Sequence, residues 1–121
     1  MPKLLDMNKF ERLYRRKMKA LGLTASTVYI KLKPVAAGKI RVLTHVTVEN
    51  TGNDYTKVRL GIDNGGVLYY LDELASPTAD ELAVARSDVL LGEGDRFFAE
   101  LIGTTTGNEL IMTCCGWEQS L

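Results

Sequence analysis

The sequence is poor in the residues from which most catalytic and metal sites are built. Its 121 residues include one histidine, His45, and two cysteines, Cys114 and Cys115, which are neighbours in the chain. Nucleophilic catalysis needs a nucleophile beside a base that a third group orients, and zinc sites need four ligands. Either cysteine reaches His45 only if their segments are adjacent in the fold, which the sequence leaves open. We therefore predict no enzyme activity, no metal site and no cofactor.

Disulfide frameworks, membrane helices and export signals are also missing from the sequence. Adjacent strand residues point to opposite faces, so Cys114 and Cys115 are expected as reduced thiols, with a strained disulfide between them as the alternative. No apolar run approaches the roughly 18–20 residues of a membrane-spanning helix, and the segment from Met1 to Asp6 has no apolar signal core. We expect a protein that is made and used without secretion and does not enter a membrane.

What the chain does have is a strong separation of charge along its length. Residues 1–41 contain eleven of the fifteen Lys and Arg but only two of the fifteen Asp and Glu, a net charge of +9. Residues 42–121 contain the other four cations and thirteen acids, a net charge of −9. The formal net charge of zero thus conceals a basic segment joined to an acidic body. Such asymmetry bears on partners and association more than on fold.

Residues 6–21 are predicted to form an amphipathic helix. The apolar residues of this segment recur at spacings of three and four, which places them on one stripe: Phe10, Leu13, Tyr14, Met18 and Leu21. Asp6 or Asn8 can cap the start of the helix, and Gly22 can end it. The rest of its surface is basic, with Lys9, Arg12, Arg15, Arg16, Lys17 and Lys19.

Beyond Gly22 the apolar period changes to the alternation of β-strands. About seven short strands separated by turn residues are expected, at 27–33, 40–49, 55–63, 67–74, 88–91, 96–102 and 109–117. The alternation leaves one polar face, which favours antiparallel pairing. The predicted fold is mainly β, an antiparallel β-sandwich, either jelly-roll-like or Ig-like, with an N-terminal helix. We divide the chain into a basic helical arm, residues 1–26, and a sandwich, residues 27–121.

The basic arm is the main candidate for partner binding. Its predicted binding residues are Lys9, Phe10, Arg12, Tyr14, Arg15, Arg16, Lys17 and Lys19. Three roles remain open: packing on the chain's own sandwich, docking on a neighbouring subunit, and binding nucleic acid. Nucleic acid is the least favoured partner, because the acidic body would repel the phosphates that the arm attracts. Outward aromatic residues offer a further alternative, a carbohydrate-binding sandwich for host adhesion, and the candidates are Tyr69, Tyr70, Phe97, Phe98 and Trp117.

The stretch from Ile40 to Glu118 resembles small β-sandwich structural proteins of tailed bacteriophages. The resemblance depends on the order of local patterns: Val46-Thr47-Val48-Glu49-Asn50-Thr51-Gly52, the strand Val58–Ile62 with a Gly-rich turn, then Val89-Leu90-Leu91-Gly92-Glu93-Gly94-Asp95, and finally a hairpin that ends in Gly116-Trp117-Glu118. It implies a non-enzymatic virion component made in the host cytoplasm, a capsid decoration (cement) or minor head protein that docks on neighbouring subunits. A head–tail connector or neck component is the alternative. The implied partners are capsid or neck proteins and further copies of the chain.

Overall fold

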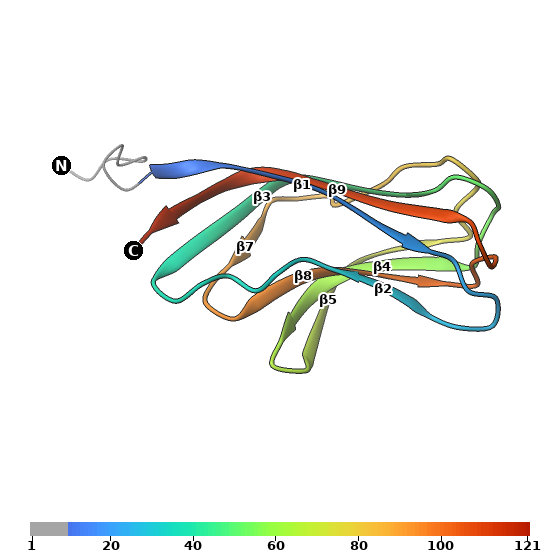
Figure 1. Ribbon diagram of the computed structural model, residues 1–121, viewed down its shortest axis with the longest axis horizontal. Helices are drawn as coiled ribbons and strands as arrows, with labels where there is room; N and C mark the ends of the chain where they lie inside the picture. Colours follow the sequence, from blue (N-terminus) through green and yellow to red (C-terminus); the bar gives the residue numbers. More distant parts are fainter. Residues whose placement is uncertain (1–9) are drawn as a thin grey trace.

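The computed structural model describes residues 10–121, with side chains from residue 13 onward, and these residues form two antiparallel β-sheets (Figure 1). The strands are β1 (Phe10–Leu21), β2 (Val28–Lys31), β3 (Lys39–Asn50), β4 (Lys57–Asn64), β5 (Val67–Ala75), β6 (Ala83–Val84), β7 (Val89–Leu91), β8 (Asp95–Ile102) and β9 (Glu109–Ser120). Sheet A has the strand order β1-β9-β3-β6, and β7 also pairs with β3. Sheet B has the order β2-β8-β4-β5. The predicted mainly β, antiparallel, two-sheet architecture is confirmed.

The predicted N-terminal helix is wrong, because residues 10–21 form strand β1. This strand is antiparallel to β9, with Tyr14 opposite Gly116 and Met18 opposite Met112. The error has a simple cause. Apolar residues four apart, such as Tyr14 and Met18, share a face in a helix and also in a strand. Leu13 and Leu21, which made the pattern look helical, lie on the exposed face of β1.

β1 is therefore an edge strand of the sandwich, and it does not form a helical arm. The segment Gly22 to Thr27 connects it directly to β2, an edge strand of sheet B. The N-terminal part of the predicted helix, residues 6–9, lies outside the described residues. Within residues 10–121 there is no helix long and apolar enough to cross a membrane.

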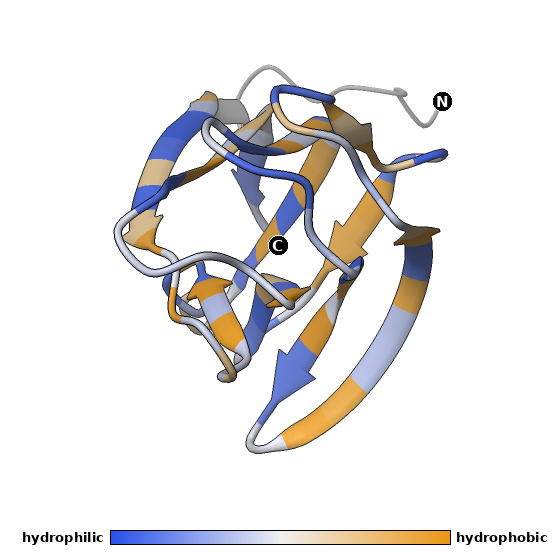
Figure 2. Ribbon diagram, turned by 90° about the vertical axis from the view of Figure 1, so that its right-hand side faces the viewer, coloured by the Kyte–Doolittle hydropathy of each residue, from blue (hydrophilic) through white to orange (hydrophobic). Residues whose placement is uncertain are grey.

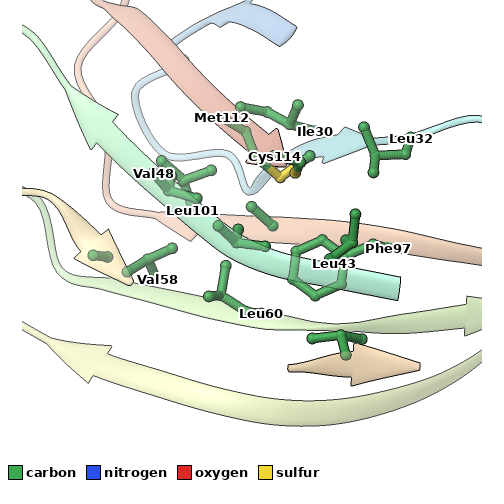
Figure 3. Close-up of a cluster of buried hydrophobic side chains, with 14 of the residues drawn as sticks. Ile30, Leu32, Leu43, Val48, Val58, Leu60, Phe97, Leu101, Met112 and Cys114 are labelled. Atoms are coloured by element: carbon green, nitrogen blue, oxygen red, sulfur yellow. The ribbon is translucent and has the colours of Figure 1, made fainter. Parts of the chain in front are cut away.

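The hydrophobic core lies between the two sheets. Hydrophobic and hydrophilic residues are mixed along the strands, as the colours of Figure 2 show. On β2 and over most of β4, buried residues alternate with more exposed ones, whereas β8 is buried without interruption from Phe97 to Leu101. Residues from both sheets meet in the interior, with Leu43, Met112 and Cys114 from sheet A facing Leu60 and Phe97 from sheet B (Figure 3). Each of these five side chains is at most 2% exposed. Their burial provides the main favourable term in folding, roughly 1.5–3 kcal/mol for each large apolar side chain.

The strands predicted from alternation are all present, and two more were not expected. β1 is one of these, and the two-residue β6 lies in the stretch 75–86, which showed no clear pattern. β6 and β7 pair with successive parts of β3, so together they complete one edge of sheet A. The turn at Asn64-Gly65-Gly66 is confirmed: Gly65 and Gly66 both have positive φ, as a two-residue hairpin loop requires.

Gly116 allows β9 to pack closely against a β-bulge in β3. The register of the β3–β9 pair shifts between Leu43 and His45, directly opposite this glycine. A Cβ atom on Gly116 would lie 1.8 Å from the carbonyl oxygen of Val42, so only glycine fits. Beyond the bulge the pairing continues to Asn50, which keeps the long central strands aligned.

Candidate docking surface

The basic residues of β1 lie along an open edge of the molecule. In the described part of the chain, β1 pairs with β9 on one side only, which leaves the backbone groups of its other side without a strand partner. The register places Arg15 opposite Cys115 and Lys17 opposite Thr113 on the outer face of sheet A. Both cations are exposed. Lys19 follows on the same face and forms an exposed ion pair with Glu109 at 3.6 Å, a type of contact that contributes little stability.

Tyr14, which was predicted to contact a partner, is instead buried at the β1 edge. Its side chain is 2% exposed and lies between two guanidinium groups, Arg16 at 4.4 Å and Arg41 at 4.1 Å from the ring centroid. Burial raises the pKa of the Tyr14 hydroxyl, and the two cations partly offset this effect. Tyr14 therefore anchors β1 to the sandwich and is not available for docking.

Arg41 connects the β1 edge to the interior through a buried ion pair. Its Nη2 atom lies 2.9 Å from Glu118 Oε2, and both side chains are at most 5% exposed. A second nitrogen, Nη1, donates a hydrogen bond to the carbonyl oxygen of Lys33 at 2.9 Å. A buried pair of this kind is strongly destabilised when one partner is removed, since the other charge is left without compensation. Arg41 thus holds Tyr14, Lys33 and Glu118 in one cluster.

A basic pocket of about 290 Å³ opens beside this cluster. Its charged lining consists of Arg16, Lys33, Lys39, Arg41 and Glu118. The pocket brings the cations of β1 next to the cations that follow β2, although the two groups are about twenty residues apart in the sequence. We use the name basic edge for the surface cations of this side of the sandwich: Arg15, Arg16, Lys17, Lys19, Lys33 and Lys39.

Of the predicted binding residues, four are placed on this edge and three cannot be assessed. Arg15, Arg16, Lys17 and Lys19 line β1, all of them exposed. Lys9 lies outside the described residues. Phe10 and Arg12 belong to β1, but their side chains lie outside the description.

The opposite edge of the sandwich has a groove that the sequence did not reveal. Two adjoining pockets, about 350 and 500 Å³, lie between β5 of sheet B and the β6–β7 region of sheet A. The acidic residues that line them are Asp72, Glu73, Glu81 and Asp88. Arg86 lies between the pockets and pairs with Asp72, with Nε 2.6 Å from Oδ1. We call this surface the acidic groove.

The acidic groove has an exposed apolar rim. Leu82 and Val84 are each 54% exposed, Leu71 is 47% exposed, and Leu90 is 67% exposed. All four line the two pockets. Apolar surface gathered in this way, and bordered by charge, marks sites where proteins bind one another. No sequence signal could have found the groove, because its residues come from β4, β5, β6, β7 and the loops beside β6, which become neighbours only in the fold.

A third cluster lies on the outer face of sheet B, and its polar groups and aromatic rings contact one another. Glu100, 3% exposed, accepts hydrogen bonds from the hydroxyls of Tyr29 at 2.9 Å and Tyr70 at 3.0 Å, and from Arg59 Nε at 2.9 Å. The Tyr29 pKa is raised chiefly by its hydrogen bond to Glu100. Both tyrosine rings pack against Phe98.

The remaining faces of these tyrosines are also engaged. Arg59 lies 4.1 Å from the centroid of Tyr70, and the Lys31 ammonium lies 5.4 Å from that of Tyr29. A sugar ring stacks on an open aromatic face, and in this cluster cations already occupy one face of each ring. This arrangement favours a structural role for the cluster. Tyr69, 54% exposed on the same strand as Tyr70, has none of these contacts in the described part of the chain.

His45 and Cys115 lie on neighbouring strands, a question that the sequence left open. β3 and β9 are adjacent, and the two residues are cross-strand partners on the outer face of sheet A. The contact made by the imidazole is with Thr44, where Nδ1 lies 3.2 Å from Oγ1. Among residues 10–121 no carboxylate orients the ring, and no cluster of metal-ligating residues is found.

The two cysteines are free and differ in environment. Cys114 is buried in the core, and this burial raises the pKa of its thiol to about 12, so it stays protonated and inert. Cys115 is partly exposed on the opposite face of β9. Reduced thiols on opposite faces of the strand agree with the expectation from sequence.

Comparison of the sequence with protein-family models and with curated proteins finds no match.

Proposed function

We propose that this chain is a non-enzymatic structural protein that docks on neighbouring subunits of an assembly through its basic edge. The single observation that supports this function most directly is the position of β1. It is a twelve-residue edge strand, unpaired on one side within the described residues, and it exposes Arg15, Arg16, Lys17 and Lys19. The edge strand takes the place of the helical arm that the sequence suggested.

An open edge strand is a natural docking element. Its free N–H and C=O groups can accept a strand from another chain, and its side chains then determine which partner fits. On β1 the cations select an acidic partner, because complementary charge accelerates encounter and fixes the register of the contact. The four lysines and two arginines of the basic edge also discourage pairing between two identical edges, since like charges would be opposed.

We propose that the assembly is the virion of a tailed phage, in which the protein is a capsid decoration or minor head protein. The order of turn and strand patterns from Ile40 to Glu118 supports this placement, and the two-sheet fold is compatible with either a jelly-roll-like or an Ig-like relative. A neck or head–tail connector position would use the same basic edge. The tightly satisfied cluster around Glu100 gives carbohydrate adhesion less support than docking.

The test is to mix the purified protein with empty heads of the tailed phage or prophage that carries its gene. Light scattering at about 0.01 M and about 0.15 M salt, where the screening length falls from about 30 Å to about 8 Å, measures the bound copies. We expect stoichiometric binding that weakens at the higher salt and is lost in the variant Arg15→Glu/Lys17→Glu. Heads that bind no protein at either salt, or a gene outside any phage genome, would contradict the placement.

A further inference from the structure

The two charged surfaces described above lie on opposite edges of the sandwich. β1 and β2 are the first strands of sheets A and B, and they are in contact with each other. β5 is the last strand of sheet B, and β6 is the last strand of sheet A. The basic edge therefore belongs to one side of the molecule and the acidic groove to the other, with β9, β3, β8 and β4 between them.

The two edges carry opposite net charge. Residues 10–41, which form the basic side, contain nine cations and one acid. Residues 67–91, which form the acidic side, contain five acids and one cation, Arg86. Arg86 is paired with Asp72, and Glu73 lies 3.9 Å from Lys57 and 3.8 Å from Arg59. The acids of the groove lining that form no ion pair in the described residues are therefore Glu81 and Asp88.

Apolar groups accompany the charges on both sides. On β1, Leu13 and Leu21 are 63% and 65% exposed and stand at either end of the run of cations. On the other side, exposed leucines and a valine rim the acidic groove. A surface that combines apolar contact with opposite charge provides both the burial and the orientation that a specific interface needs.

The two edges of one molecule cannot meet, because the whole width of both sheets separates them. We infer that the acidic groove binds the basic edge of a second copy of this chain, so that copies associate head to tail. This inference rests on the proposed function as an assembly protein, and it names the neighbouring subunit as a further copy. The contact is heterologous, which means that a bound pair retains one free basic edge and one free groove and can extend into a ring or a row.

The experiment uses two charge variants, each of which reverses or removes the charge of one surface and leaves the other surface intact. The basic-edge variant is Arg15→Glu/Lys17→Glu, and the groove variant is Glu73→Gln/Asp88→Lys. Arg15, Lys17 and Asp88 are exposed and their side chains form no ion pair in the described residues, and Glu73 makes only half-exposed ion pairs at 3.8 and 3.9 Å. A matched control, Glu49→Gln/Glu93→Lys, makes the same change of charge as the groove variant at two residues that line neither pocket of the groove.

Sedimentation velocity at about 0.01 M salt, where screening is weak, gives the masses. We expect the wild type and the control to associate as concentration rises, and each edge variant alone to stay monomeric. An equimolar mixture of the two edge variants should form a 1:1 dimer and stop there, because one intact basic edge meets one intact groove.

Three results would overturn the inference: a wild type that is monomeric at every concentration, edge variants that associate like the wild type, or a mixture that contains only monomers. Circular dichroism and thermal unfolding test whether each variant is folded. If a double variant does not fold, the single variant Lys17→Glu or Asp88→Lys replaces it. No phage heads are present in this experiment. Self-association without head binding would contradict the virion placement alone, and head binding without self-association would contradict this inference alone.

Discussion

At the scale of single residues, the fold depends on a few positions where the backbone leaves no freedom. Gly116 is the clearest, since any side chain at this position would overlap with the carbonyl group of Val42. The sequence marked Gly116 only as part of a terminal pattern. Its role depends on a bulge in another strand, more than seventy residues away, and no local rule predicts where such a bulge falls.

Replacing Gly116 with alanine should lower the free energy of unfolding by about 3 kcal/mol, because β3 and β9 must separate locally to admit the methyl group. Urea-induced unfolding followed by tryptophan fluorescence measures the change. Gly92→Ala is the matched control, since a Cβ atom there would meet nothing closer than Asp95 Oδ2 at 3.9 Å. Equal stability of the two variants would show that the close approach of the strands does not matter.

Asp63 gives a prediction about pH. The hydrogen bond from Lys31 Nζ, at 2.8 Å, and one from the amide of Gly66 lower the pKa of its carboxyl group below the ordinary value of 3.8. A lowered folded-state pKa means that the stabilisation is complete above pH 3.8 and is lost as pH falls through the folded-state value.

We therefore expect wild type to be more stable than Asp63→Asn near neutral pH, with a difference that shrinks as pH falls below 3.8. Urea unfolding at a series of pH values measures it. In Lys31→Met, an NMR titration should show the carboxyl pKa of Asp63 moving up toward 3.8. A stability difference that stays constant down to acid pH would mean that the ion pair does not contribute.

At the scale of elements, alternation in the sequence was a sound guide and apolar spacing was not. The strands from β2 to β5 and from β7 to β9 follow from alternating residues and turn formers. β1 was missed because Tyr14 and Met18 satisfy both periods, and because pairing with β9, at the far end of the chain, decides between them. Strand pairing is tertiary information, and it overrides a local helical pattern.

Two alanine variants separate the strand from the helix. Tyr14→Ala should cost about 3 kcal/mol of stability, because it removes a buried ring from the edge of the core. Leu13→Ala should stay within about 0.5 kcal/mol, because in the strand this side chain faces outward. Thermal unfolding of both variants provides the comparison. Similar losses of stability for the two variants would contradict the strand and support a helix, in which both side chains are buried on one stripe.

At the scale of the whole molecule, the charge separation along the sequence becomes a separation between two edges. The basic surface was foreseen in its residues, with Arg15, Arg16, Lys17 and Lys19 all on the β1 edge, although the element that bears them was wrong. Tyr14 was assigned to a partner and is instead buried. The acidic groove could not be predicted, because β5, β6 and β7 become neighbours only when β3 and β4 lie in facing sheets.

The mass of the equimolar mixture of the basic-edge and groove variants at low salt tests the proposed contact between copies more directly than any other measurement. A 1:1 dimer, formed from two proteins that are each monomeric alone, would show that the basic edge of one copy binds the acidic groove of another. A mixture that sediments as two separate monomers would contradict this contact.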